Sequence, residues 1–260
     1  YDAMKKLVEL FVTKYQDIMA IYPCWNYLFI VSKEQKVNLK YFTFKSEGKS
    51  LQPNLQQLAG YINQKTKMIY LSSPNSISGQ SLDKEAFDKF INNIPDNIPV
   101  VIDQSFVDFS ENKKALNPLE YLDKNVIVLR SMNNFYGFEN LELAYVISDM
   151  DIANLLQKSQ IIDMPLNRLN EEIALTAYQD QNYNNYVRSN IKKERERLYK
   201  IFKENNIEYY LSEANFILFK PNNNTKTEIV KELEKNKIIL YASNDVYGSY
   251  WTLPINKKSV

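Results

Sequence analysis

The chain contains no histidine among its 260 residues. This absence excludes catalytic triads built on histidine, zinc sites with histidine ligands and histidine general bases. Proton transfer in this protein would have to use lysine, tyrosine or carboxylate side chains. We therefore predict no metal site and no histidine-dependent hydrolase.

Cysteine and long apolar runs are also scarce. Cys24 is the single cysteine, so no disulfide can form within the chain, which is typical of a reducing compartment. Without a base nearby in the sequence, Cys24 is interpreted as a small buried hydrophobe. No apolar run reaches the roughly 20 residues that span a bilayer, and the first residues do not resemble a signal peptide. We expect a cytoplasmic protein that does not enter a membrane.

The charges are balanced, with 32 lysines and arginines against 31 acidic residues and a net charge of +1. Such a balance gives no overall attraction to nucleic acid. The run KKERER at residues 192–197 has mixed signs and favours a solvated helix face over a nucleic-acid site. Small, near-neutral ligands are the expected partners. A hydrophobic content of 45% predicts a globular chain with a large core.

Short apolar segments separated by helical ones occupy the first part of the chain. This alternation predicts an α/β fold, a mostly parallel sheet with helices on both faces. Ligands in such sheets bind beyond the carboxyl ends of the strands. The predicted strands are residues 17–22, 37–44, 67–71, 99–103, 125–129 and 143–148, and the predicted helices are 1–15, 55–62 and one capped by Asp83.

After about residue 149 the pattern becomes mainly helical. We predict a large α/β domain over residues 1–155 and a small α+β domain over 156–260. The helices expected after residue 149 are 152–156, one through 173–178, 183–205 and 226–235. A break is expected at Pro165, a turn at 222–224 and strands at 215–219, 238–241 and 250–253.

Three segments at predicted strand ends are distinctive: SPNSISG at 73–79, VVIDQSF at 100–106 and VLRSMNNFYGFENLELAY at 128–145. In this order they resemble the class I/II aminotransferases of fold type I, in particular the histidinol-phosphate aminotransferase-like branch. The resemblance covers essentially the whole chain and implies pyridoxal phosphate as cofactor. It begins after the family's phosphate-binding turn, so we expect the N-terminal part of that fold to lie outside this chain.

The resemblance implies roles for four residues around the cofactor ring. Asn75 would donate a hydrogen bond to the phenolic oxygen, and Asp103 would pair with the protonated pyridine nitrogen. Phe106 stands where a tyrosine hydroxyl normally contacts the same phenolic oxygen. Trp25 is similar to the aromatic residue that stacks on the ring.

The third segment departs from the family pattern while keeping its spacing. Ser131 and several other residues match, which puts Asn134 at the position of the Schiff-base lysine. Asn133 replaces a phosphate-binding serine, and Glu142 replaces the phosphate-binding arginine. Near the C-terminus, Trp251 falls closest to the arginine that would bind the substrate carboxylate.

These substitutions favour a catalytically silent domain with a structural, regulatory or ligand-binding role. Because the family's sites are completed by a dimer, we expect a homodimer or heterodimer, and a small-molecule ligand is possible. An alternative is an active enzyme with altered chemistry, which would need a lysine such as Lys45 or Lys49 to reach the site. A third hypothesis, one engineered change at Asn134, leaves Glu142 unexplained. Structural interpretations also exist, because Asp103 can cap a turn and Asn75 can form one.

Overall fold

The computed structural model describes residues 1–22, 24, 26–112, 114–141, 143–159, 167–221, 231, 235, 241–242 and 250–255. Trp25, Pro165, Glu142 and the predicted turn at 222–224 lie outside these residues, as do most of the predicted helix 226–235 and strand 238–241. Within the described part, the chain forms a seven-stranded sheet and a four-stranded sheet.

The larger sheet has the order β3-β2-β1-β4-β5-β6-β7. The strands β2, β1, β4, β5 and β6 run parallel, and the two edge strands β3 and β7 pair antiparallel. This confirms the predicted α/β class with a mostly parallel sheet. The strands are β1 (Asp17–Tyr22), β2 (Asn38–Glu47), β3 (Ser50–Pro53), β4 (Thr66–Ser72), β5 (Val100–Asp103), β6 (Val126–Ser131) and β7 (Ala144–Ile147).

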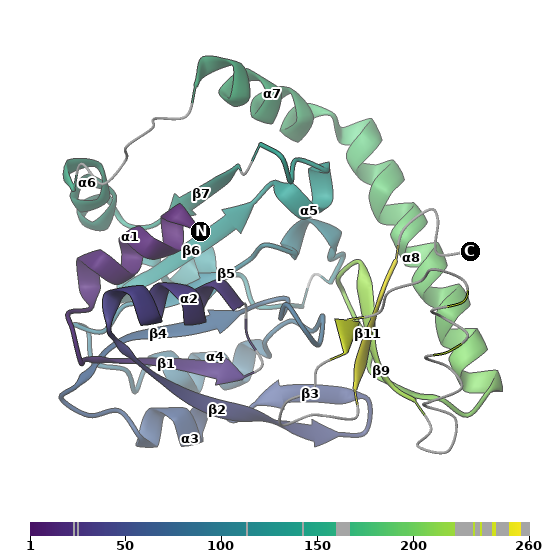
Figure 1. Ribbon diagram of the computed structural model, residues 1–260, viewed down its shortest axis with the longest axis horizontal. Coiled ribbons are helices and arrows are strands. Elements are labelled where there is room, and N and C mark those ends of the chain that lie inside the picture. The colour runs from purple at the N-terminus through teal and green to yellow at the C-terminus, as the bar shows by residue number, and fades with distance from the viewer. Residues whose placement is uncertain are drawn as a thin grey trace.

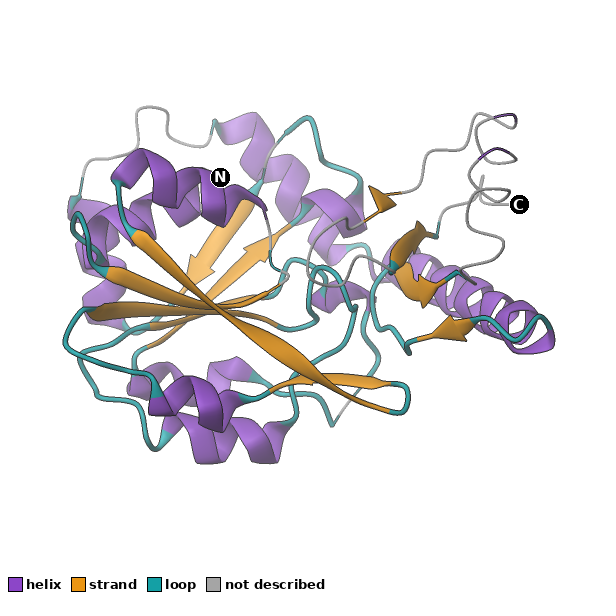
Figure 2. Ribbon diagram, turned by 60° about the horizontal axis from the view of Figure 1, so that its bottom comes forward, coloured by secondary structure: helices purple, strands orange, loops and turns teal. Residues whose placement is uncertain are grey.

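Helices cover both faces of this sheet (Figures 1 and 2). On one face, α1 (Asp2–Phe11), α2 (Asn26–Gln35) and α6 (Met150–Lys158) bury Leu7, Val31 and Ile152 in one apolar cluster. On the other, α3 (Leu55–Gly60), α4 (Lys84–Ile91) and η2 (Pro118–Lys124) contribute Leu58, Phe87 and Tyr121 to a second cluster. Burial of these side chains on folding supplies the main stabilisation of the layers. Asp83 caps α4 as predicted, accepting from the Ala86 N–H.

The C-terminal part is built on α7 (Arg168–Gln179) and the long α8 (Gln181–Glu204). Leu198 and Phe202 of α8 pack with Ile217 and Trp251 of the antiparallel four-stranded sheet. That sheet consists of β8 (Glu208–Tyr209), β9 (Phe216–Lys220), β10 (Tyr241–Ala242) and β11 (Trp251–Pro254). The predicted division at residues 155 and 156 lies within α6 and stays a prediction.

Several short elements were not predicted. Residues 24–27 were expected to be a loop or a first helical turn, whereas α2 continues to Gln35. The hairpin of β2 and β3 turns at Gly48, whose φ of +60° is accessible to glycine without strain. The first helix ends at Phe11 instead of Tyr15, because Val12 is extended and Tyr15 has a positive φ. The connections η1 (Val107–Phe109) and α5 (Asn133–Tyr136) were also unpredicted.

Gln80 and Glu213 are among the side chains that join the C-terminal part to the large sheet. The Gln80 Nε2 donates to the Lys49 carbonyl at 2.9 Å and to the Leu211 carbonyl at 2.8 Å, while its Oε1 accepts from the Leu51 N–H at 2.7 Å. The Glu213 carboxylate accepts hydrogen bonds from three side chains of the large sheet's loops: Ser81 Oγ, Ser110 Oγ and Asn112 Nδ2. These bonds position the loops that follow β4 and β5.

Within the described ranges, none of the helices combines the length and the apolar character that a bilayer span requires. The cytoplasmic location expected from the composition stays a prediction.

Candidate functional site

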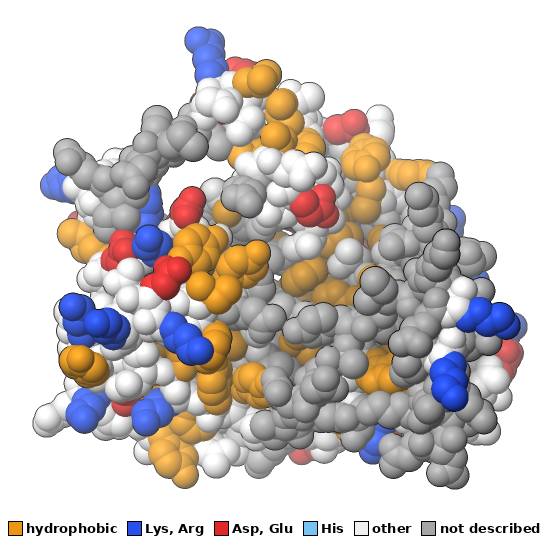
Figure 3. Space-filling view, viewed as in Figure 1, with side chains coloured by type: hydrophobic (Ala, Val, Ile, Leu, Met, Phe, Trp, Pro, Cys, Tyr) orange, Lys and Arg blue, Asp and Glu red, His pale blue; other side chains and the backbone are white. Residues whose placement is uncertain are grey.

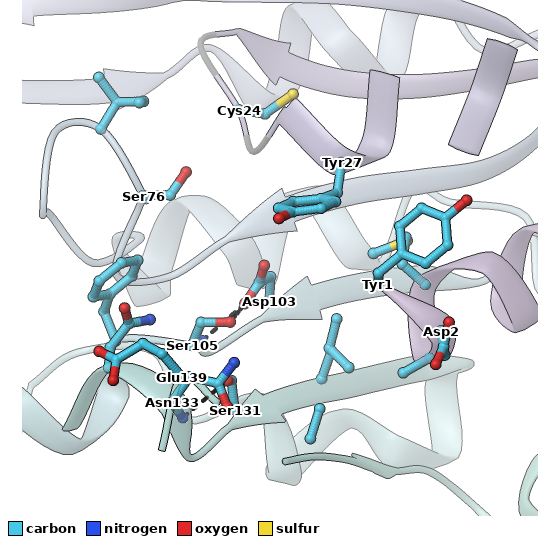
Figure 4. A pocket seen from close by; sticks show the side chains of 17 residues that line it. Tyr1, Asp2, Cys24, Tyr27, Ser76, Asp103, Ser105, Ser131, Asn133 and Glu139 are labelled. Atoms are coloured by element: carbon cyan, nitrogen blue, oxygen red, sulfur yellow. Dashed lines mark hydrogen bonds between the residues drawn. The ribbon is translucent and has the colours of Figure 1, made fainter. Parts of the chain in front are cut away.

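A cavity of about 530 Å³ lies at the carboxyl ends of the parallel strands (Figure 4). Its lining includes Cys24 after β1, Ser76 after β4, Asp103 at the end of β5 and Ser131 at the end of β6. The parallel strands therefore place polar groups together at the carboxyl-terminal edge of the sheet, which is where an α/β sheet binds its ligands. The cavity volume is within the range of small-molecule sites.

Asp103 is the most deeply placed acid of the cavity, with 3% of its surface exposed. Its Oδ2 accepts from the Tyr70 hydroxyl at 2.7 Å, and its Oδ1 accepts from the Ser105 N–H at 2.8 Å and from Ser105 Oγ at 2.5 Å. Burial raises the pKa of Asp103, and the hydrogen bonds from Ser105 and Tyr70 oppose that rise. The carboxylate is held rigidly at the strand end.

Cys24 is buried beside this carboxylate. Burial raises the pKa of the Cys24 thiol to about 12, and the negative charge of Asp103 adds to the rise. The thiol is protonated at neutral pH and is a poor nucleophile. The structure thus places Cys24 as a buried hydrophobe that also contributes to the cavity wall.

Asn75 forms the turn after β4 and is absent from the described cavity lining. Its Oδ1 accepts from the N–H groups of Ile77 and Ser78, both at 2.9 Å, and its Nδ2 donates to Ser72 Oγ at 2.9 Å. The side chain is therefore engaged in shaping the SPNSISG turn. A contact between Asn75 and a cofactor stays a prediction.

The segment after β6 contributes three polar residues to the cavity: Ser131, Asn133 and Asn134. Ser131 Oγ accepts from the Asn133 N–H at 3.2 Å, which fixes the start of α5. The Asn133 Oδ1 is buried and, among the described residues, has no hydrogen-bond partner, and the same holds for Ser76 Oγ. The structure thus brings Asn134, the predicted lysine position, into the same cavity as Asp103.

Phe106 lines the cavity and belongs to an aromatic cluster. Its ring meets Phe216 edge-on at 5.2 Å between centroids and stacks near Phe109 at 6.5 Å. A contact between Phe106 and a ligand stays a prediction. Trp251, by contrast, is buried in the small domain's core, with its ring edge-on to Phe219 at 6.0 Å, and is not among the described lining residues.

Sequence reasoning missed four acidic or aromatic contributors: Tyr1, Asp2, Tyr27 and Glu139. Glu139 follows Asn134 by five positions, inside the segment that carries the resemblance, so its position in the chain was a usable signal. Asp2 and Glu139 join Asp103 as carboxylates of the cavity. The described lining holds no lysine or arginine to balance them.

Around the amino-terminal end of α1, the surface shows acidic and basic side chains beside hydrophobic ones (Figure 3). Lys49, considered from the sequence as a replacement lysine, lies elsewhere, with its Nζ 3.7 Å from the centre of the Tyr209 ring. The side chain of Lys45 lies outside the described part of the structure.

Known proteins of similar sequence include aminotransferases. Residues 1–250 match the family model of "Aminotransferase class I and II". The chain is 33% identical over 201 residues to histidinol-phosphate aminotransferase 2 of Archaeoglobus fulgidus, covering 75% of this chain and 55% of that protein. It is 28% identical over 222 residues to the protein of the same name from Haemophilus influenzae, covering 83% of this chain and 58% of that protein. The chain thus spans little more than half the length of these relatives.

Solved structures of low sequence identity share the fold. Histidinol-phosphate aminotransferase from Sinorhizobium meliloti, solved in complex with pyridoxal-5'-phosphate, has a TM-score of 0.86 at 19% identity, covering 99% of this chain and 70% of that one. Cystalysin from Treponema denticola, which contains the same cofactor, has a TM-score of 0.85 at 14% identity, with 97% and 69% covered. The predicted architecture of fold type I is confirmed.

Proposed function

Because this chain belongs to the class I and II aminotransferase family, we propose that it is a catalytically silent member that binds a small ligand or a partner chain without transferring an amino group. One observation carries the proposal. Asn134, which aligns with the Schiff-base lysine of the family, lines the cavity, and the described lining contains no lysine.

The chemistry of the carboxamide explains the loss. Its nitrogen lone pair is delocalised into the carbonyl group, so Asn134 cannot condense with an aldehyde or accept a proton from a substrate carbon. Cys24 does not compensate, since its pKa of about 12 keeps the thiol protonated. The remaining groups can bind and orient a ligand.

The cavity also fits the family's cofactor poorly. Asp103 is suited to pair with a ring N–H, because one acceptor position of its carboxylate remains beyond the three hydrogen bonds it receives. A phosphate dianion, however, would meet the carboxylates of Asp2, Asp103 and Glu139 without a lysine or arginine in the described lining. These residues do not fit a phosphorylated cofactor, and we derive no reaction step through one.

A second candidate is an active enzyme with altered chemistry, acting on a small amino or phosphorylated substrate. The intact arrangement of Asp103 with Tyr70 and Ser105 favours this alternative, because it would keep a pyridine ring electron-withdrawing. The alternative needs a lysine in the cavity, and Lys49 is occupied with Tyr209. An engineered change at Asn134 alone would not explain the carboxylates.

Incubation with pyridoxal phosphate tests the proposal. We expect the purified protein to show no absorbance band of an internal aldimine and, after borohydride treatment, no added mass on any lysine. The Sinorhizobium meliloti enzyme, solved with this cofactor, is the positive control. A band that borohydride removes, with cofactor mass on a lysine, would overturn catalytic silence.

Assembly with a second copy is part of the proposal. The helix α7 contains no buried residue, and Leu169 (69% exposed), Leu175 (49%) and Tyr178 (52%) present apolar surface on it. Apolar surface of this kind is typical of interfaces between chains. It supports a homodimer or a heterodimer with a related chain.

A further inference from the structure

The carboxylates of the cavity surround its interior from separate elements (Figure 4). Asp2 comes from the first turn of α1, Asp103 from the end of β5 and Glu139 from the turn after α5. Asp2 and Glu139 are exposed and partly screened by solvent, whereas Asp103 is buried. The described lining holds no lysine or arginine, and the positive amino terminus at Tyr1, whose charge acts to lower the pKa of Asp103, offsets only part of the three carboxylates. The potential inside the cavity is therefore negative.

Two buried acceptors in the same cavity are left without donors. The Asn133 Oδ1 and the Ser76 Oγ are shielded from solvent and have no hydrogen-bond partner among the described residues. A buried acceptor without a donor is costly, so rotation of the Asn133 or Ser76 side chain toward a ligand that offers N–H groups would be favoured. An ammonium group carries three donors and no acceptor, and it matches this requirement.

Aromatic rings form part of the wall. Tyr1 and Tyr27 meet edge-on with centroids 5.9 Å apart, and Phe106 lines the cavity near Ser105. Ring faces and edges accommodate a flat aromatic ligand. The faces of such rings also attract organic cations.

Asp103 is the buried carboxylate that a cationic ligand could approach. Its carboxylate receives hydrogen bonds from Tyr70 and Ser105, which are neutral donors, and the positive charge of the amino terminus at Tyr1 also acts on it. A buried carboxylate gains most from a cation that approaches its remaining acceptor position. The geometry therefore favours a ligand whose positive charge can reach the end of β5.

We propose that this cavity binds a small aromatic amine in its cationic form and discriminates against phosphorylated analogues. This inference rests on the proposed function, because it requires a cavity without a covalently bound cofactor. The ligand class is one aromatic ring with a protonated primary amine, and a volume of about 530 Å³ holds such a molecule.

Three probes with the same ring and different charge test the inference: benzylamine, benzyl alcohol and benzyl phosphate. In isothermal titration at neutral pH and low salt, we expect benzylamine to bind at least about tenfold tighter than benzyl alcohol, and benzyl phosphate to bind more weakly than both. Equal affinity for the amine and the alcohol, tighter binding of the phosphate, or no binding of the amine overturns the inference.

Substitutions locate the effect in the cavity. Glu139→Gln should weaken benzylamine binding about threefold to tenfold and leave benzyl alcohol unchanged. Glu139→Lys should bring benzyl phosphate above benzyl alcohol in affinity. Glu196→Gln, on an exposed position of α8 away from the cavity, is the matched control and should change neither. The same loss in Glu139→Gln and Glu196→Gln contradicts the inference, and circular dichroism checks that each variant is folded.

Pyridoxal phosphate, titrated in parallel, separates the two proposals. An aldimine band overturns catalytic silence. Non-covalent binding of pyridoxal phosphate tighter than that of benzylamine, without a band, leaves catalytic silence standing and overturns the charge preference. Weak binding of pyridoxal phosphate together with tight binding of benzylamine supports both.

Discussion

The hydroxyl of Tyr70 donates a hydrogen bond of 2.7 Å to the carboxylate of Asp103, and both residues are buried on neighbouring parallel strands. The pair joins the core of the large sheet to the floor of the cavity. Burial raises the pKa of Tyr70 as well as that of Asp103. The hydroxyl therefore stays protonated and remains a donor throughout the neutral range.

The raised pKa of Asp103 predicts a pH-dependent stability. The pKa of Asp103 is raised above its ordinary value of 3.8 in the native state, so the folded protein keeps this proton at pH values where the unfolded chain has released it. The contribution of Asp103 to the free energy of unfolding therefore falls as pH rises from 3.8 through the raised pKa. Asp103→Asn should remove that slope. Ser105→Ala, which deletes a hydrogen bond that lowers the pKa, should extend the slope to higher pH. Urea unfolding between pH ~4 and ~7 measures both.

At neutral pH, Asp103→Ala should destabilise the protein more than Asp103→Asn. It leaves the Tyr70 hydroxyl and the Ser105 N–H without their acceptor, which costs about 1–3 kcal/mol. Asp103→Asn keeps an acceptor and removes a buried charge, so we expect a change below about 1 kcal/mol. A larger loss in Asp103→Asn than in Asp103→Ala would contradict the assigned hydrogen bonds.

Restoring the lysine alone should not restore an enzyme. Asn134→Lys supplies an amine, but Glu139 and Asp2 still line the cavity, and the resemblance predicts Glu142 at the position of the family's phosphate-binding arginine. We expect no measurable transamination and weak cofactor binding. The combined variant Asn134→Lys, Glu139→Gln, Glu142→Arg should bind pyridoxal phosphate at least about tenfold tighter than Asn134→Lys, by absorbance titration. Turnover by the single variant would refute the electrostatic part of the proposal.

Gly79 is predicted to tolerate no side chain. Its φ is +71°, and a Cβ there would lie 2.0 Å from Ser212 Oγ and 2.9 Å from Ser212 Cβ. Backbone strain and the clash together should lower the free energy of unfolding by about 2–4 kcal/mol in Gly79→Ala. Gly60→Ala is the control, because Gly60 has open space and lies in α3, where alanine is neutral or stabilising. Comparable urea midpoints for the two variants would show the turn to be adaptable.

Glu213 should be a major stabilising contact between the two parts of the chain. Glu213→Ala leaves Ser81, Ser110 and Asn112 without their shared acceptor, with an expected loss of about 2–3 kcal/mol. Glu204→Ala removes an exposed ion pair with Lys200 at 3.9 Å and should cost less than about 0.5 kcal/mol. Chemical unfolding of Glu213→Ala and Glu204→Ala measures the loss in the free energy of unfolding for each variant. Equal losses would argue against the role of Glu213.

The apolar surface of α7 predicts a self-associating protein. We expect a dimer by analytical ultracentrifugation, and Leu175→Glu should weaken its association at least about tenfold by placing a charge in the interface. Leu119→Glu changes a residue that is 36% exposed on η2 and serves as the control. A parent chain that stays monomeric at all concentrations would refute the homodimer.

The fold was largely predictable because its strands are short, apolar and buried. The observed strands β1, β4, β5 and β6 agree with their predicted ranges to within two residues. Helix α2 escaped prediction because Phe29 and Ile30 are exposed while Leu28 and Val31 are buried. Apolar residues on all sides of a helix remove the periodic signal on which such predictions depend.

The site was predictable where it rests on strand ends and less so elsewhere. Asp103, Ser131, Phe106 and Asn134 all line the cavity. Asp103 and Ser131 were expected there from their places at strand ends, and Phe106 and Asn134 from the family resemblance, while their roles toward a ligand stay predictions. Asn75 uses its amide within its own turn. Glu139 was not recognised, because an exposed glutamate in a turn carries no local pattern and its place inside the segment 128–145 was the only usable signal.

The hydrogen bonds of Gln80 connect segments at different distances along the chain, and this predicts an order of folding. Its bond to Leu51 spans 29 residues and its bond to Leu211 spans 131, so the first closes a short loop and the second a long one. Closing the longer loop costs more chain entropy and becomes favourable after the nearer partners are in place. The β2–β3 hairpin is therefore expected to form before the C-terminal segment docks, and during synthesis the large sheet can be complete while residues after Leu211 are still being added.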